Sequence, residues 1–162
     1  MARRVFYSFN YDEDNWRVSQ VKQMGAVEGQ PILGSNAWED VEAGGKPAIK
    51  AYIDGEMANK SCLVVLIGAH TANREWVDYE IKKAWDDGKG VIGVRINKLH
   101  DREGNASAAG ANPFSGFTVG GVQLDTLVKV HTPAGTTSTD VYAAIKDNIA
   151  SWVEAGIAQR SK

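Results

Sequence analysis

The sequence contains little cysteine, no excess of charge and no long apolar run. Its single cysteine, Cys62, cannot form a disulfide within the chain and lies in an apolar run, where we expect a reduced, buried thiol. The 18 basic and 20 acidic residues give a net charge of -2, which disfavours a dedicated nucleic-acid binder because such proteins neutralise phosphates with a basic excess. No stretch approaches the ~20 apolar residues of a membrane span. The first apolar run is too short for a signal peptide, so we expect a cytoplasmic protein that binds neither nucleic acid nor membrane.

Several motifs of common chemistries are also missing. No phosphate-binding GxxxxGK[ST] loop, no GxGxxG after the first predicted strand and no GxSxG elbow occur. The three histidines are far apart and have no metal-ligand spacing, so we expect neither a metal nor a resident cofactor. A receiver domain of similar architecture needs an aspartate at the end of its third strand, and residues 66–70 contain no acid.

Apolar and amphipathic segments alternate along the 162 residues, which predicts one domain over residues 1–162. Runs rich in β-branched residues predict strands; they lie at residues 5–9, 62–67, 91–96 and 127–130, with a weaker extended segment at 29–33. Helical spacing of apolar residues predicts helices; they lie at residues 12–24, 47–57, 74–87 and 139–153. This order predicts an α/β fold, a flavodoxin-like, doubly wound parallel sheet of about five strands.

In such sheets, ligands bind at the carboxyl ends of the strands. The loops that follow the strands therefore deserve scrutiny, among them residues 32–46, which carry Trp38. Residues 97–126 show no convincing period and contain five glycines. We interpret them as a long glycine-rich loop insertion that acts as a lid or an assembly surface.

The segment 74–81 carries the most specific chemical signal. On a helix, Trp76 and Glu80 are four residues apart and share a face, while Val77 and Ile81 point into the core. Two interpretations remain open from spacing alone. Glu80 either pairs with a basic neighbour on a solvated face, or borders the core beside an aromatic ring as a functional carboxylate.

Two motifs resemble those of TIR domains. The run Val5-Phe6-Tyr7-Ser8-Phe9 resembles their first strand, and Trp76-Val77-Asp78-Tyr79-Glu80-Ile81 resembles their Trp-Cys-x-x-Glu helix motif, with Val77 at the usual cysteine. The match is closer to the bacterial TIR-like family that includes the Thoeris anti-phage sensor, through Trp16-Arg17 and Val65-Leu66-Ile67-Gly68. The resemblance covers most of residues 4–97 and is only architectural beyond them.

This resemblance implies a function. Catalytic TIR domains cleave the bond between ribose and nicotinamide in NAD with the glutamate found here at Glu80, and NAD is their substrate rather than a cofactor. A carboxylate suits the chemistry because it stabilises the oxocarbenium-like transition state. The resemblance further implies a released ADP-ribose-derived signal, expected to be a cyclic ADP-ribose isomer, which activates a separate effector protein. The substrate-binding residues that we predict are Ser8, Phe9, Asn10, Trp38, His70 and Trp76.

Alternatives remain for the activity and for single residues. The chain is alternatively a non-catalytic TIR scaffold that signals by self-association, although the intact Glu80 and Trp76 argue for the enzyme. A nucleoside deoxyribosyltransferase-like enzyme also uses a glutamate beside a ribose. Trp76 is equally explained by packing between helix and sheet, and His70 by a solvated loop.

Overall fold

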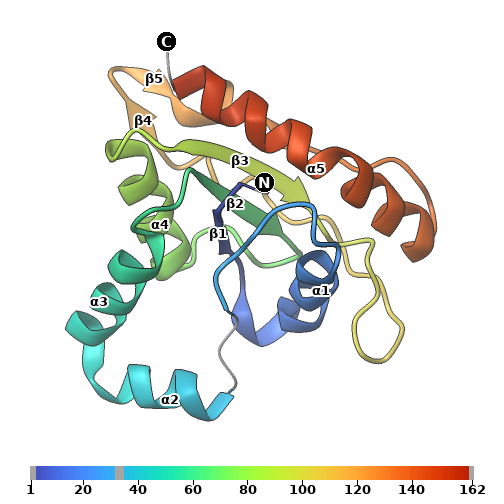
Figure 1. Cartoon of the computed structure of the whole chain (residues 1–162), viewed down its shortest axis with the longest axis horizontal. Coiled ribbons are helices and arrows are strands. Elements are labelled where there is room, and N and C mark those ends of the chain that lie inside the picture. Colours follow the sequence, from blue (N-terminus) through green and yellow to red (C-terminus); the bar gives the residue numbers. More distant parts are fainter. Residues whose placement is uncertain (1–2, 32–34, 161–162) are drawn as a thin grey trace.

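The computed structural model describes residues 3–31 and 35–160. In these residues four parallel strands form the main sheet, in the order β1-β2-β3-β6 (Figure 1). Their bounds are β1 Val5–Ser8, β2 Cys62–Ile67, β3 Gly90–Arg95 and β6 Val130–His131. The parallel α/β sheet expected of a TIR-like, flavodoxin-like fold is confirmed, with four strands in the described residues where about five were predicted.

Helices cover both faces of this sheet (Figure 1). On one face lie α1 (Tyr11–Gln23) and α5 (Ser138–Arg160), and on the other lie α3 (Gly45–Met57) and α4 (Glu75–Asp86). Strand β2 explains this arrangement, since all six of its residues are buried and its side chains alternate between the two cores. The buried Cys62 belongs to the core under α1 and α5, as the sequence predicted. No helix in the described part of the chain is both long and apolar enough to cross a bilayer.

The predicted segment 29–33 does not form a regular strand where the structure describes it. A single parallel bridge joins Arg4 to Glu28, and residues 32 and 33 lie outside the described residues. Beyond this bridge, the side chain of Gln30 makes the hydrogen bonds that a neighbouring strand would make with β1. Its Oε1 accepts a hydrogen bond from the Tyr7 backbone N–H at 2.8 Å, and its Nε2 donates to the Tyr7 carbonyl at 2.9 Å. This amide therefore closes the edge of β1 immediately before Ser8.

Replacing Gln30 by alanine is expected to destabilise the protein. Gln30 is 5% exposed, so its loss leaves the buried N–H and C=O of Tyr7 without partners. We expect a loss of about 1–3 kcal/mol in the free energy of unfolding, measured by urea denaturation. An unchanged unfolding midpoint in Gln30→Ala would show that solvent satisfies this edge.

Residues 35–43 were predicted as part of a loop, and that prediction was wrong. They form helix α2, Ser35–Ala43, which packs against α3. Trp38 and Val41 are three residues apart and pack together against the core under α3 and α4. The turn-like composition of residues 34–36 obscured this short helix in the sequence.

The long segment 97–126 is more ordered than predicted. It includes a hairpin of β4 (Thr118–Val119) and β5 (Val122–Gln123), followed by a 3₁₀ turn, Leu124–Thr126. Gly120 and Gly121 connect the strands with φ of 55° and 80°, the conformation of a tight type I′ turn. The last strand was predicted at residues 127–130, and in the structure it is β6, a strand of two residues. Its pairing with β3 covers only Val130 and His131.

Candidate active site

Glu80 lies at the interface between α4 and the end of β1. Helix α4 buries Val77 and Ile81 against the sheet, which brings the neighbouring Glu80 toward the first strand. The Glu80 side chain is 8% exposed, and Ser8 Oγ donates a hydrogen bond of 2.7 Å to its Oε1. Glu80 makes no ion pair with a basic side chain in the described residues, which excludes the solvated-face interpretation.

Burial changes the protonation of this carboxyl group. Desolvation raises the pKa of Glu80 to about 8, and the hydrogen bond from Ser8 opposes that rise only in part. In the free protein near neutral pH, Glu80 is therefore mainly a neutral acid. A positively charged group placed beside it would favour the carboxylate and lower this pKa.

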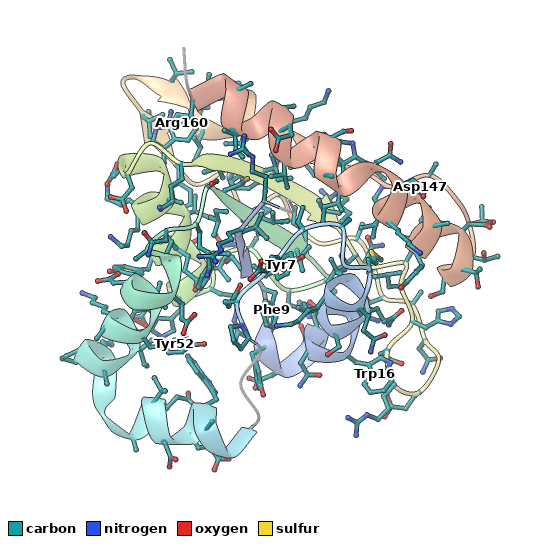
Figure 2. The ribbon with its side chains drawn as sticks, viewed as in Figure 1. Tyr7, Phe9, Trp16, Tyr52, Asp147 and Arg160 are labelled. Carbon is teal, nitrogen blue, oxygen red and sulfur yellow. The ribbon has the colours of Figure 1, made fainter. Side chains whose placement is uncertain are left out.

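A small aromatic cavity lies next to Glu80. It has a volume of about 100 Å³ and is lined by Phe6, Tyr7, Phe9, Tyr11, Gln30, Pro31, Trp38, Tyr52, Ile53, Trp76, Val77 and Glu80. Figure 2 shows Phe9 close to β1 and Tyr52 on α3, two elements that contribute to this lining. Tyr11 stacks on Trp38 with ring centroids 6.2 Å apart, and Trp38 meets Tyr52 edge-on at 6.0 Å. Such walls suit a flat, uncharged or cationic ring.

A wider cavity lies next to this aromatic cavity. It has a volume of about 400 Å³, within the range of roughly 300–1,000 Å³ typical of ligand pockets. The two cavities share five lining residues, Phe9, Tyr11, Trp38, Trp76 and Val77. The outer cavity adds polar and charged residues, Asp12, Glu42, Asn73, Arg74 and Glu75. A ligand can thus place one ring beside Glu80 and extend its polar part outward.

Four of the predicted substrate-binding residues gather around Glu80. Ser8 contacts it directly, and Phe9, Trp38 and Trp76 line both cavities. Trp76 also meets the Tyr79 ring edge-on at 5.7 Å, so its packing role and its position at the cavity coexist.

Asn10 and His70 have other surroundings. The Asn10 side chain caps α1 by accepting a hydrogen bond from the Glu13 N–H, and it donates to the His70 carbonyl at 3.1 Å. His70 is exposed, and its Nδ1 lies 2.8 Å from Glu13 Oε1. Neither residue lines the inner or the outer cavity. Asn10 instead fixes the start of α1, which positions Tyr11 at the cavity.

Tyr52, Tyr11 and Gln30 are among the residues of the inner cavity that were not predicted. Tyr52 belongs to an apolar helical stripe, which indicates core packing rather than a site. Burial, with smaller contributions from the charges of Glu56 and Glu80, raises its pKa to about 12. Tyr11 follows the predicted loop residues directly and could have been included on that ground. Gln30 gave no sequence signal, because its role depends on the edge of β1.

Comparison with known proteins shows which family the chain resembles. The sequence model of the family described as "Thoeris protein ThsB, TIR-like domain" matches residues 6–101, more than half of the chain. A protein of Bacillus cereus (strain MSX-D12) is 39% identical over 119 residues, which cover 70% of this chain. Its printed name is "Putative cyclic ADP-D-ribose synthase ThsB1". The aligned segment spans 62% of that relative's own length.

Proposed function

The chain belongs to the TIR-like family of the Thoeris protein ThsB, and from this premise we propose that it is an NAD-cleaving enzyme with Glu80 as its catalytic residue. The observation that carries the proposal is the buried carboxyl group of Glu80 beside an aromatic cavity, held by Ser8 at 2.7 Å. Flat aromatic walls and one carboxyl group suit a cationic nicotinamide ring joined to a ribose.

The proposed reaction needs one carboxylate and no acid for the leaving group. The bond between ribose C1′ and the nicotinamide nitrogen breaks, and its electron pair neutralises the cationic ring, which leaves as nicotinamide. The positive charge moves to the ribose, where the ionised Glu80 stabilises the oxocarbenium-like transition state. A nucleophile then attacks C1′ and loses a proton. If the nucleophile is water, the product is ADP-ribose; if it is a group of the same molecule, the product is cyclic.

The substrate itself favours the reactive form of Glu80. In the free protein Glu80 is mainly the neutral acid near neutral pH, because burial raises its pKa to about 8. The positive nicotinamide ring next to the carboxyl group favours its ionised form. Binding of the correct, cationic substrate therefore prepares the carboxylate that its cleavage requires.

The name of the Bacillus cereus relative extends the proposal to the product. We propose that attack within the same molecule yields a cyclic ADP-ribose isomer, and that this nucleotide activates a separate effector protein. Because the product diffuses, the effector protein does not need to contact the site around Glu80.

Incubation of the purified protein with NAD in heavy-oxygen water, followed by mass spectrometry, tests this proposal. Cyclisation gives nicotinamide and a product lighter than ADP-ribose by one water, without heavy oxygen. Hydrolysis gives ADP-ribose that carries the label. If the folded protein leaves NAD intact, both alone and in lysate from phage-infected cells, the enzyme proposal fails and a scaffold role takes its place.

The pH dependence of kcat/KM should follow the ionisation of Glu80. Because this parameter reports the free enzyme, we expect it to rise with pH and to level off above an inflection near 8. Ser8→Ala removes the hydrogen bond that lowers this pKa, so the inflection should move to higher pH by about half a unit to one unit. Initial rates from pH 6 to 9.5, with Ser115→Ala in the exposed part of the chain as the control, measure both effects. An inflection that Ser8→Ala leaves in place would show that another group controls the rate.

A further inference from the structure

The outer cavity carries more negative than positive charge. Three carboxylates line it, Asp12, Glu42 and Glu75, and Arg74 is the one basic residue among its described lining residues. Glu75 is neutralised by Lys46 Nζ, 2.9 Å from its Oε1. Arg74 Nη2 lies 3.9 Å from Asp12 Oδ2, a distance longer than a direct hydrogen bond.

Glu42 is the carboxylate whose charge is not compensated. It is exposed and forms no ion pair with any residue that the structure describes. Glu42 follows Trp38 by four residues on α2, so both side chains are on the same side of the helix, and both line the outer cavity. Its neighbour Glu39 lines neither cavity, although it is on the same helix and is also exposed.

These charges have consequences for a dinucleotide whose nicotinamide end occupies the inner cavity. The outer cavity adjoins the inner one around Trp38 and Trp76 and offers room for the rest of the molecule. Arg74 can donate to the pyrophosphate, since its loose contact with Asp12 leaves guanidinium N–H groups available. Carboxylates accept hydrogen bonds from ribose hydroxyl groups but repel an additional phosphate.

We propose that the outer cavity selects NAD over NADP, with Glu42 as the specificity-determining residue that disfavours a phosphate on the adenosine ribose. The inference rests on the proposed cleavage of NAD at Glu80. The buried Glu80 lines the inner cavity and not the outer one, which fixes which end of the dinucleotide faces outward. The 2′-hydroxyl of the adenosine ribose then meets a surface whose net charge is negative.

Comparison of kcat/KM for NAD and NADP tests the proposal in the wild type and in Glu42→Lys, Glu42→Gln and Glu39→Lys. The wild type should prefer NAD by at least about tenfold. Glu42→Lys should lower this preference by about five- to tenfold through the KM for NADP, since reversal of one charge changes an exposed pair by that order. Glu42→Gln should have an intermediate effect, and Glu39→Lys, with the same charge change on α2, should leave the preference unchanged within about twofold.

Two outcomes would overturn this inference, and they differ from failure of the proposed function. A wild type that cleaves both dinucleotides equally well contradicts the selectivity. A preference for NAD that persists in both Glu42 variants contradicts the role of that residue. If the wild type cleaves neither dinucleotide, the proposed cleavage of NAD fails first and the selectivity fails with it.

Discussion

Substitution of Glu80 by glutamine is expected to reduce cleavage of NAD by a factor of about a thousand or more, with the fold intact. Glutamine has nearly the same shape as the glutamic acid and still accepts the hydrogen bond that Ser8 donates. It has no negative charge, however, and cannot stabilise the positive ribose of the transition state. Nicotinamide release at saturating NAD measures the effect. The matched control is Glu103→Gln, a change at an exposed loop residue that lines neither cavity.

The same variant has a signature in stability. Burial raises the pKa of Glu80 to about 8 from the ordinary 4.5 of an exposed glutamate. The stability linked to this group is therefore fully present below pH 4.5 and is lost as pH rises through 8. Glu80→Gln removes this dependence. We therefore expect the variant to gain stability relative to the wild type as pH rises across that window. Urea denaturation at pH 5 and pH 8.5 measures the gain, and equal changes at both pH values would contradict the assigned burial of the ionisable group.

Substitution of Arg17 by methionine should produce the largest loss of stability, about 3–5 kcal/mol. The Arg17 side chain is 4% exposed, and its Nη1 lies 2.9 Å from the Oδ1 of Asp14, which is 1% exposed. Arg17 Nε also donates to the Leu99 carbonyl at 2.7 Å, and Nη2 donates to the Asn105 carbonyl at 2.9 Å. Its loss leaves the buried Asp14 and the Leu99 carbonyl without their donor, while the Asn105 carbonyl keeps the hydrogen bond from the Asp101 N–H. The pKa of Asp14 is already raised by burial, and it should rise further in this variant.

Chemical denaturation of two further variants separates these contributions. Lys82→Met removes an exposed ion pair with Asp86 on α4 and should cost less than about 1 kcal/mol. The double variant Arg17→Met with Asp14→Leu also removes the buried acid that has lost its partner. It should recover a substantial part of the lost stability. Amide exchange should also become faster in residues 99–107, because Arg17 attaches this segment to α1. A cost for Arg17→Met no larger than that for Lys82→Met would contradict the structural role of the pair.

The sequence predicted the sheet and the centre of the site for physical reasons that are local. Strand β2 is apolar on both faces, which is typical of a strand covered by helices on both sides. This pattern predicted a sheet between two layers of helices. The spacing of Trp76 and Glu80 placed the carboxyl group beside the apolar face of α4. The resemblance to TIR domains named both Ser8 and Glu80 as site residues, and in the structure the two side chains are within hydrogen-bond distance.

What the sequence did not predict depends on long-range contacts. Gln30 acts through the backbone of Tyr7, which is 23 residues away in the chain, and no local pattern indicates such a pairing. Tyr52 follows a helical core pattern and still reaches the cavity, because α2 supplies Trp38 opposite it. The substrate role of Asn10 stays a prediction, and the structure adds that its side-chain amide caps α1.

Mass spectrometry of nucleotides in cells that express the wild type or Glu80→Gln, before and during phage infection, tests the central claim most directly. The claim predicts that NAD falls and that nicotinamide and an ADP-ribose-derived product lighter by one water accumulate, with the wild type alone. A nucleotide pool that stays unchanged during infection, with folded protein confirmed in both samples, would contradict it.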